Sequence, residues 1–172
     1  MAVRRILQLG DPLLRQVSRP VADAAEAAKT LADLRDTLHE FRRTHGFGRG
    51  ISAVQIGLLN RVIYIEFEGE TYPLINPVFD WQSEEKFALW DDCFSFPELL
   101  VRVERFEAIR LRYLDERGAA RTLEAAGALS ELVQHEMDHL DGILAIDRAI
   151  DRYSFCTRAE YERRYRSGSA AG

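Results

Sequence analysis

The spacing of apolar side chains predicts helices near both ends of the chain. One helix is expected from about Asp23 to His45, because its leucine and phenylalanine residues recur at steps of three and four and Gly46 follows as a C-terminal stop. A short helix is expected at Asp11-Pro12, where an N-cap residue precedes proline. Helical spacing returns from about 126 to 140, and an amphipathic, arginine-rich last helix is expected over roughly 154–166.

Alternating side chains predict strands between these helices. A strand from Arg61 to Phe67 should turn into a second one, Tyr72 to Ile75, and Asn76-Pro77 should break that pairing. Residues 78–90 are typical of an irregular strand, and 101–114 of a strand pair or one bent strand. The order of elements predicts a small α+β domain over residues 1–166, followed by a flexible tail at 167–172.

Composition narrows the function classes. The chain has 172 residues, 47% of them hydrophobic, and a net charge of −5, which fits one folded domain and gives no electrostatic drive toward nucleic acid. No apolar run approaches the ~20 residues of a membrane helix. No extended apolar stretch follows Arg4-Arg5, so we expect no signal peptide. Cys93 and Cys156 are too few for a disulfide framework, which favours a reducing, cytoplasmic location.

The segment Gln134–His139 carries the clearest chemical signal. His135 and His139 are four positions apart, so on a helix they lie one turn apart on the same face, within reach of one metal ion. Glu136 lies beside that face, where a carboxylate can act on water without binding the metal. The competing interpretation is a solvated surface helix that matches the His-Glu-x-x-His pattern by chance. The surrounding apolar period favours a buried helix instead, where such polar groups need partners.

A catalytic site of this kind normally has three protein ligands, and two candidates can supply the third. The metzincin pattern fails, because its third histidine position is Ala145. A thermolysin-like site would use a glutamate about twenty residues downstream, where Glu160 stands. Cys93 lies upstream in a turn-like segment between aspartates and Pro97, which is unusual for a core cysteine, and its thiolate would complete a Cys/His/His set. Cys156 lacks such a context.

Residues 48–57 are rich in glycine, which allows a ligand to approach the backbone closely. Gln55 adds one neutral amide near the end of this stretch. A phosphate-binding loop is excluded, because the stretch has no Gly-Lys-Ser/Thr ending and precedes a strand instead of opening a helix.

Together these segments resemble the peptide deformylases, which carry G-x-G-x-A-A-x-Q, E-G-C-L-S and Q-H-E-x-D-H motifs in this order. Here the segments are GRGISAVQ (48–55), DDCFS (91–95) and QHEMDH (134–139), and the similarity covers most of residues 6–150. The resemblance implies a metal helix wrapped by antiparallel strands. It also implies that one divalent ion, typically ferrous iron with zinc or nickel as substitutes, is bound by three residues: Cys93, His135 and His139.

The resemblance further implies hydrolysis of the N-formyl group from the formyl-methionine of newly made polypeptides, with release of formate. Glu136 would act as general acid–base. Gln55 and the backbone N–H of Phe94 would stabilise the oxyanion, and Gly50 would pair with the substrate backbone.

Several substrate-facing positions depart from the family pattern. Asp92 replaces a glycine, Phe94 a leucine, and Arg49 an aliphatic residue of the methionine pocket. The alternatives are therefore a related amidohydrolase acting on another N-formyl or N-acyl compound, a peptidase that uses Glu160, and a metal-binding module closed by Asp92. Ribosome contact through the basic last helix competes with a merely solvated helix face; the arginines concerned are Arg158, Arg163, Arg164 and Arg166.

Overall fold

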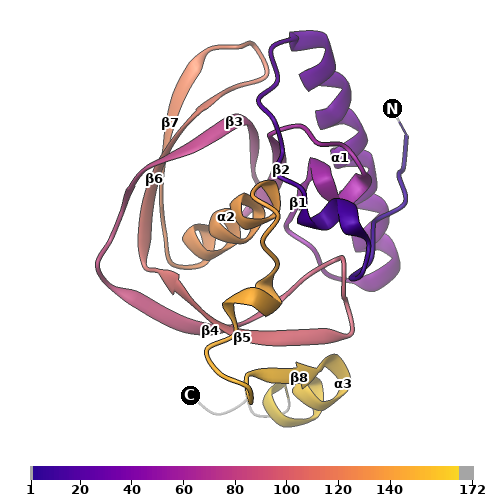
Figure 1. Cartoon of the computed structure of the whole chain (residues 1–172), viewed down its shortest axis with the longest axis vertical. Coiled ribbons are helices and arrows are strands. Elements are labelled where there is room, and N and C mark those ends of the chain that lie inside the picture. The colour runs from indigo at the N-terminus through magenta and orange to yellow at the C-terminus, as the bar shows by residue number, and fades with distance from the viewer. Residues whose placement is uncertain (1, 167–172) are drawn as a thin grey trace.

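The computed structural model of the chain describes residues 2–166, and the predicted tail at 167–172 lies outside this range. Helix α2 (Gly127–Leu140) lies in the middle of the molecule, strands pass around it on several sides, and helix α1 (Ala24–His45) covers one flank (Figure 1). Every residue of α2 from 130 to 140 is buried. The predicted α+β arrangement around a central helix is confirmed.

Helix α1 begins and ends as its sequence predicts. The Asp23 side chain accepts a hydrogen bond from the backbone N–H of Ala25, and Gly46 adopts the left-handed conformation that ends helices (φ 79°). The apolar stripe of α1 is buried in a core cluster shared with strands β1 (Gly50–Ser52) and β2 (Val62–Phe67). The glycine-rich segment between α1 and β1 is thereby held next to the core.

The larger sheet contains five antiparallel strands in the order β1-β2-β3-β6-β7. Its remaining members are β3 (Glu70–Gln82), β6 (Ala108–Leu114) and β7 (Ala120–Ala126). The side-chain pattern does not predict strand β7. Only Ala125 of β7 is buried. The strand therefore shows no clear alternation of buried apolar and exposed polar residues, which is the signal that predicts a half-buried strand.

Strand β3 continues past Asn76-Pro77, where the sequence predicts a break. Its pairing with β2 does end at Ile75, and from there the strand pairs with β6 after a register shift. Asn76 takes a left-handed conformation (φ 52°), and its side-chain amide exchanges two hydrogen bonds of 2.8 Å with the Val21 backbone. The Asn-Pro pair therefore makes a bulge that changes the strand's partner.

A smaller sheet of order β4-β5-β8 lies below α2 in Figure 1. It comprises β4 (Lys86–Asp92), β5 (Leu99–Phe106) and β8 (Phe155–Thr157). The predicted last helix is shorter than expected, because β8 occupies its first turn; α3 spans Arg158–Tyr161 and continues as a π-helical turn over Glu162–Arg166. The short helix expected after Asp11 is a 3-10 turn (Pro12–Arg15), as is Ala145–Arg148 after α2.

Two apolar clusters lie on either side of the functional segments, and the first of them contains residues of α2. This cluster joins Leu132, Val133, Met137 and Leu140 to strands of the larger sheet, and the other lies under the smaller sheet and includes Cys93. Among residues 2–166, no helix has the length and apolar character needed to cross a membrane.

Candidate metal centre

Cys93, His135 and His139 meet at the centre of the molecule. Their ligand atoms all lie within 4.8 Å of one another, with 3.2 Å between the two histidine Nε2 atoms and 3.3 Å from Cys93 Sγ to His139 Nε2. Tetrahedral coordination at ordinary metal–nitrogen and metal–sulfur bond lengths places such donors roughly 3.3–3.6 Å apart. All three side chains are buried. The donor set therefore fits a single bound metal ion.

The turn after β4 delivers Cys93 to this point. The strand ends at Asp92, and Phe96 N–H closes the turn by donating to the Cys93 carbonyl oxygen at 3.1 Å. Ser95 N–H points at Cys93 Sγ from 3.4 Å, and Gln55 Nε2 lies 3.7 Å from the same sulfur. Two N–H groups are therefore directed at the sulfur atom that would bind a metal ion.

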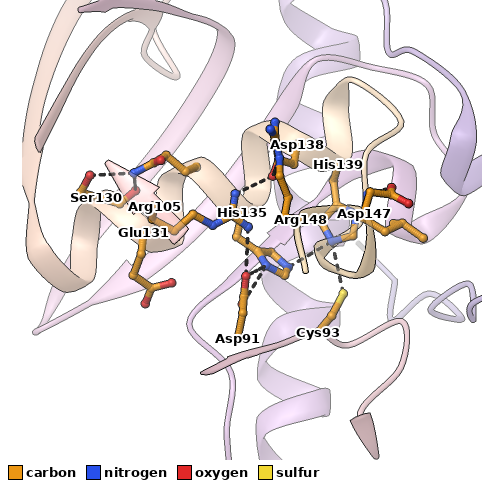
Figure 2. A network of polar contacts seen from close by, with 12 residues as sticks. Asp91, Cys93, Arg105, Ser130, Glu131, His135, Asp138, His139, Asp147 and Arg148 are labelled. Carbon is orange, nitrogen blue, oxygen red and sulfur yellow. Dashed lines mark hydrogen bonds and ion pairs between the residues drawn. The ribbon is translucent and has the colours of Figure 1, made fainter. Parts of the chain in front are cut away.

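A buried ionic network orients the His135 ring through its Nδ1 atom (Figure 2). His135 Nδ1 lies 3.0 Å from both carboxylate oxygens of Asp91. Arg105 lies between Asp91 and Asp138, donating to them at 3.0 and 2.5 Å, and Asp138 also accepts from Arg148. In the neutral form of His135, this carboxylate keeps the proton on Nδ1 and leaves Nε2 as the free ring nitrogen, 3.2 Å from His139 Nε2.

Charges near the histidines shift their pKa values in opposite directions. Burial disfavours the charged form of His135, but Asp91 and Cys93 outweigh it and raise the pKa of this imidazole well above its ordinary value. Burial and the positive charge of His135 lower the pKa of His139. Burial also opposes ionisation of Asp91, yet contacts with His135 and Arg105 lower its pKa to about 2. Asp91 is therefore a permanent anion beside the cluster.

Glu136 lies against the glycine-rich segment. Its carboxylate is buried and accepts a hydrogen bond of 2.6 Å from Ser52 Oγ. Burial raises the pKa of Glu136, while His135 and Ser52 oppose that change. A Cβ atom at Gly50 would stand 2.9 Å from Glu136 Oε1, so glycine is what allows strand β1 to approach the carboxylate.

Gln55 and Phe94 border the same space. Gln55 belongs to the 3-10 turn Ala53–Ile56 that follows β1, and its Oε1 accepts from Ser52 N–H at 2.9 Å, which leaves its NH₂ group directed toward Cys93. The Phe94 ring stacks on Phe41 of α1 at a centroid distance of 3.8 Å. This stacking anchors the residue whose backbone N–H follows Cys93.

A cavity of about 450 Å³ opens onto these groups. Its lining includes Cys93, His135 and Glu136, and also the two charged residues among those that depart from the family pattern, Arg49 and Asp92. Each is held by an ion pair across the cavity wall: Arg49 with Glu131 at 2.6 Å, and Asp92 with Arg158 of α3 at 2.8 Å.

The structure does not bring every candidate to the cluster. Glu160 is on α3, where its carboxylate pairs with Arg163 and Arg164, and it is not part of the Cys/His/His group. Cys156 lies on β8 and is partly exposed.

Asp91, Arg105 and Glu131 are site residues that the sequence analysis does not single out as such. Val101, Val103 and Arg105 share the buried face of β5, so an arginine at a core position of an alternating strand is the signal for a buried ion partner. Glu131 precedes His135 by one helical turn, which places it on the metal-facing line of α2.

The family model for polypeptide deformylases matches residues 3–154 of this chain. The chain belongs to the peptide deformylase family. It is 39% identical over 155 residues to peptide deformylase 2 of Clostridium perfringens, covering 89% of this chain and 97% of the relative. It is 37% identical over 155 residues to the peptide deformylase of Bartonella tribocorum, covering 86% of this chain and 84% of that protein.

Solved peptide deformylases share its fold. The Thermotoga maritima enzyme superposes with a TM-score of 0.81 at 32% identity, covering 88% of this chain and all of the other. The Synechococcus elongatus enzyme, solved in complex with actinonin, gives 0.80 at 31% identity, with 90% and 86% covered. The chain is thus a hydrolase that uses a metal ion to remove the N-formyl group from newly made polypeptides, as its motifs predict.

Proposed function

We propose that Cys93, His135 and His139 hold one divalent ion, ferrous iron, and that this cluster is the deformylation centre. The observation that carries the proposal is the convergence of three buried donor atoms within 4.8 Å of one another, beside a cavity that Cys93, His135 and Glu136 line. When bound, such an ion supplies Lewis-acid polarisation and a water molecule activated at neutral pH. Zinc and nickel fit the same donor set.

Glu136 moves the protons of the reaction in this proposal. It takes a proton from the attacking water as the water oxygen bonds to the formyl carbon, and it delivers a proton to the amine nitrogen as the carbon–nitrogen bond breaks. The products are formate and a free N-terminus. The Ser52 hydrogen bond of 2.6 Å holds the carboxylate beside the cluster, and the absence of a side chain at Gly50 leaves room for it.

Two donors stabilise the charge that develops on the formyl oxygen. We assign this role to the side-chain NH₂ of Gln55 and the backbone N–H of Phe94, each worth typically about 3–4 kcal/mol in such sites. Gly50 pairs with the substrate backbone, and Arg49 and Asp92 border the substrate at the cavity wall. Gln55 Oε1 already accepts a hydrogen bond from Ser52 N–H. This contact supports an orientation in which the NH₂ group of the amide faces the formyl oxygen.

Purification without oxygen, followed by metal analysis and a formate-release assay on formyl-Met-Ala, tests the proposal. The wild-type chain should carry about one divalent ion. Glu136→Gln should retain the ion and lose about 10²–10⁴-fold in kcat, whereas Cys93→Ser should lose the ion. A Glu136→Gln variant with unchanged kcat would contradict the assignment.

The proposed location is a reducing cytoplasm, because oxidation of Cys93 would remove the thiolate that binds the ion. Both cysteines are free thiols in the structure. The proposed partners are N-formyl-methionyl nascent peptides. Ribosome contact through α3 receives little support, since Arg158 pairs with Asp92, and Arg163 and Arg164 pair with Glu160. These pairs favour a solvated helix face.

A further inference from the structure

The Arg49–Glu131 ion pair is a charged wall in the cavity beside the metal ligands. Glu131 and His135 are one turn apart on α2, so the Glu131 carboxylate lies next to the deformylation centre and points to the side on which Asp91 and Cys93 lie (Figure 2). Arg49 reaches it from the segment before β1 and donates to Oε1 at 2.6 Å. Both side chains line the cavity of about 450 Å³.

The two partners differ in exposure. The Glu131 side chain is 6% exposed and the Arg49 side chain 43%, so the guanidinium covers the carboxylate and presents its outer side to the cavity. Burial raises the pKa of Glu131, and the charge of Arg49 opposes that rise. Within residues 2–166, the Arg49 side chain makes a hydrogen bond only through one Nη atom. Its remaining N–H donors are available to water or to a ligand.

A substrate side chain that enters the cavity displaces water from these donors. An aliphatic end group leaves them without an acceptor, which is unfavourable, whereas an oxygen acceptor replaces the lost water. Leu132 also lines the cavity, so an apolar stem can be accommodated next to the guanidinium. The wall therefore matches a side chain with an apolar stem and an acceptor at its end.

We propose that the Arg49–Glu131 pair is a specificity determinant that favours N-formyl peptides whose first side chain ends in a hydrogen-bond acceptor over peptides with an aliphatic side chain of the same length. The inference rests on the proposed function, because it places the first side chain in this cavity. Methionine, whose thioether sulfur is a weak acceptor, ranks between an aliphatic side chain and one that ends in an amide or sulfoxide oxygen.

Three peptides of matched length test the ranking: formyl-Met-Ala, formyl-norleucyl-Ala and formyl-methionine-sulfoxide-Ala. On the wild-type enzyme, kcat/KM for the sulfoxide should exceed that for norleucine by about 10-fold, since a partly exposed donor discriminates less than a fully buried one. A wild-type ratio of one or less overturns the inference, and this outcome needs no variant.

The Arg49→Leu/Glu131→Leu double variant removes both charges, which avoids leaving a buried carboxylate unpaired. Its sulfoxide-to-norleucine ratio should fall about 10-fold, to near one. The matched control is Arg43→Leu/Glu40→Leu, which removes an exposed Arg–Glu pair on α1 outside the cavity and should leave the ratio unchanged. An unchanged ratio in a folded, metal-loaded cavity double variant overturns the inference.

Failure of the proposed function gives a different result. In that case the metal-loaded wild-type enzyme, with its Cys/His/His cluster intact, releases no formate from formyl-Met-Ala at all. An enzyme that is active on formyl-Met-Ala but shows no acceptor preference refutes only the role of the ion pair.

Discussion

Replacing Asp91 by asparagine should weaken metal binding without touching a metal ligand. Asp91 accepts from His135 Nδ1 at 3.0 Å and from Arg105 at 3.0 Å, all three groups being buried. Arg105 donates to Oδ2, and His135 Nδ1 lies 3.0 Å from both carboxylate oxygens, so the NH₂ group of an asparagine would face at least one of these two donors. His135 would lose the anion that orients its ring and would have to share the one remaining acceptor oxygen with Arg105.

The expected loss of metal affinity follows from the hydrogen bond between Asp91 and the proposed ligand His135. Loss of such a partner typically lowers metal affinity about 10–100-fold, which corresponds to about 1.4–2.7 kcal/mol. Removal of one carboxylate from a buried ion pair also lowers the free energy of unfolding, by about 3 kcal/mol. These two effects have to be separated.

Asp138→Asn supplies the matched control. Asp138 contacts the other side of the same Arg105 guanidinium at 2.5 Å and makes no hydrogen bond to His135. Both variants should therefore lose stability, whereas only Asp91→Asn should lose metal affinity. The assay is titration of each metal-free protein with Zn²⁺ against a chromophoric chelator. Equal affinities for Asp91→Asn and the wild type, or equal losses in the two variants, would refute this reasoning.

Gly142→Ala should lower the free energy of unfolding by about 3 kcal/mol or more, because the new Cβ would stand 2.5 Å from a backbone carbonyl oxygen at a φ of 72°. Gly57→Ala is the control, because Gly57 also has a positive φ (82°) but no atom within 4 Å of the new Cβ, and it should lose only about 1 kcal/mol. Denaturant unfolding measures both values. Burial of Glu66 raises its pKa, but hydrogen bonds from neighbouring side chains outweigh burial and lower it from 4.5 to about 2. The ionised Glu66 carboxylate therefore stabilises the fold fully above pH 4.5, and this stabilisation is lost as the pH falls through about 2. Glu66→Gln should lower the free energy of unfolding by about 1 kcal/mol at pH 7 and by much less near pH 2, and a difference that is constant with pH contradicts this. Cys93→Ser should lose the bound metal and Glu160→Gln should retain it, as judged by metal analysis; the reverse result would restore the thermolysin-like assignment.

Local patterns carry most of what the sequence predicts correctly. The Asp23 cap, the apolar stripe and Gly46 bound α1 within one residue of its observed ends, because all three signals act within a few turns. The four-residue spacing of His135 and His139 likewise needs only helix geometry. Such features follow from neighbours in sequence.

Features that depend on distant partners were harder to predict. Strand β7 exists because it pairs with β6, and a nearly fully exposed sequence gives no sign of this. Cys93 joins the histidines only through the turn that ends β4. The sequence favours Cys93 through its neighbouring aspartates and Pro97, but it leaves Glu160 open as an alternative ligand. The Arg49–Glu131 pair spans 82 positions, so neither charge identifies the other in the sequence.

Metal content and formate release, measured together on the anaerobically purified chain, test the central claim most directly. The account predicts about one divalent ion per chain in the wild type, chiefly iron, with formate released from formyl-Met-Ala in proportion to bound metal, and loss of both in Cys93→Ser. Full formate release by a chain stripped of metal, or unchanged metal content in Cys93→Ser, would contradict the assignment of the Cys/His/His cluster.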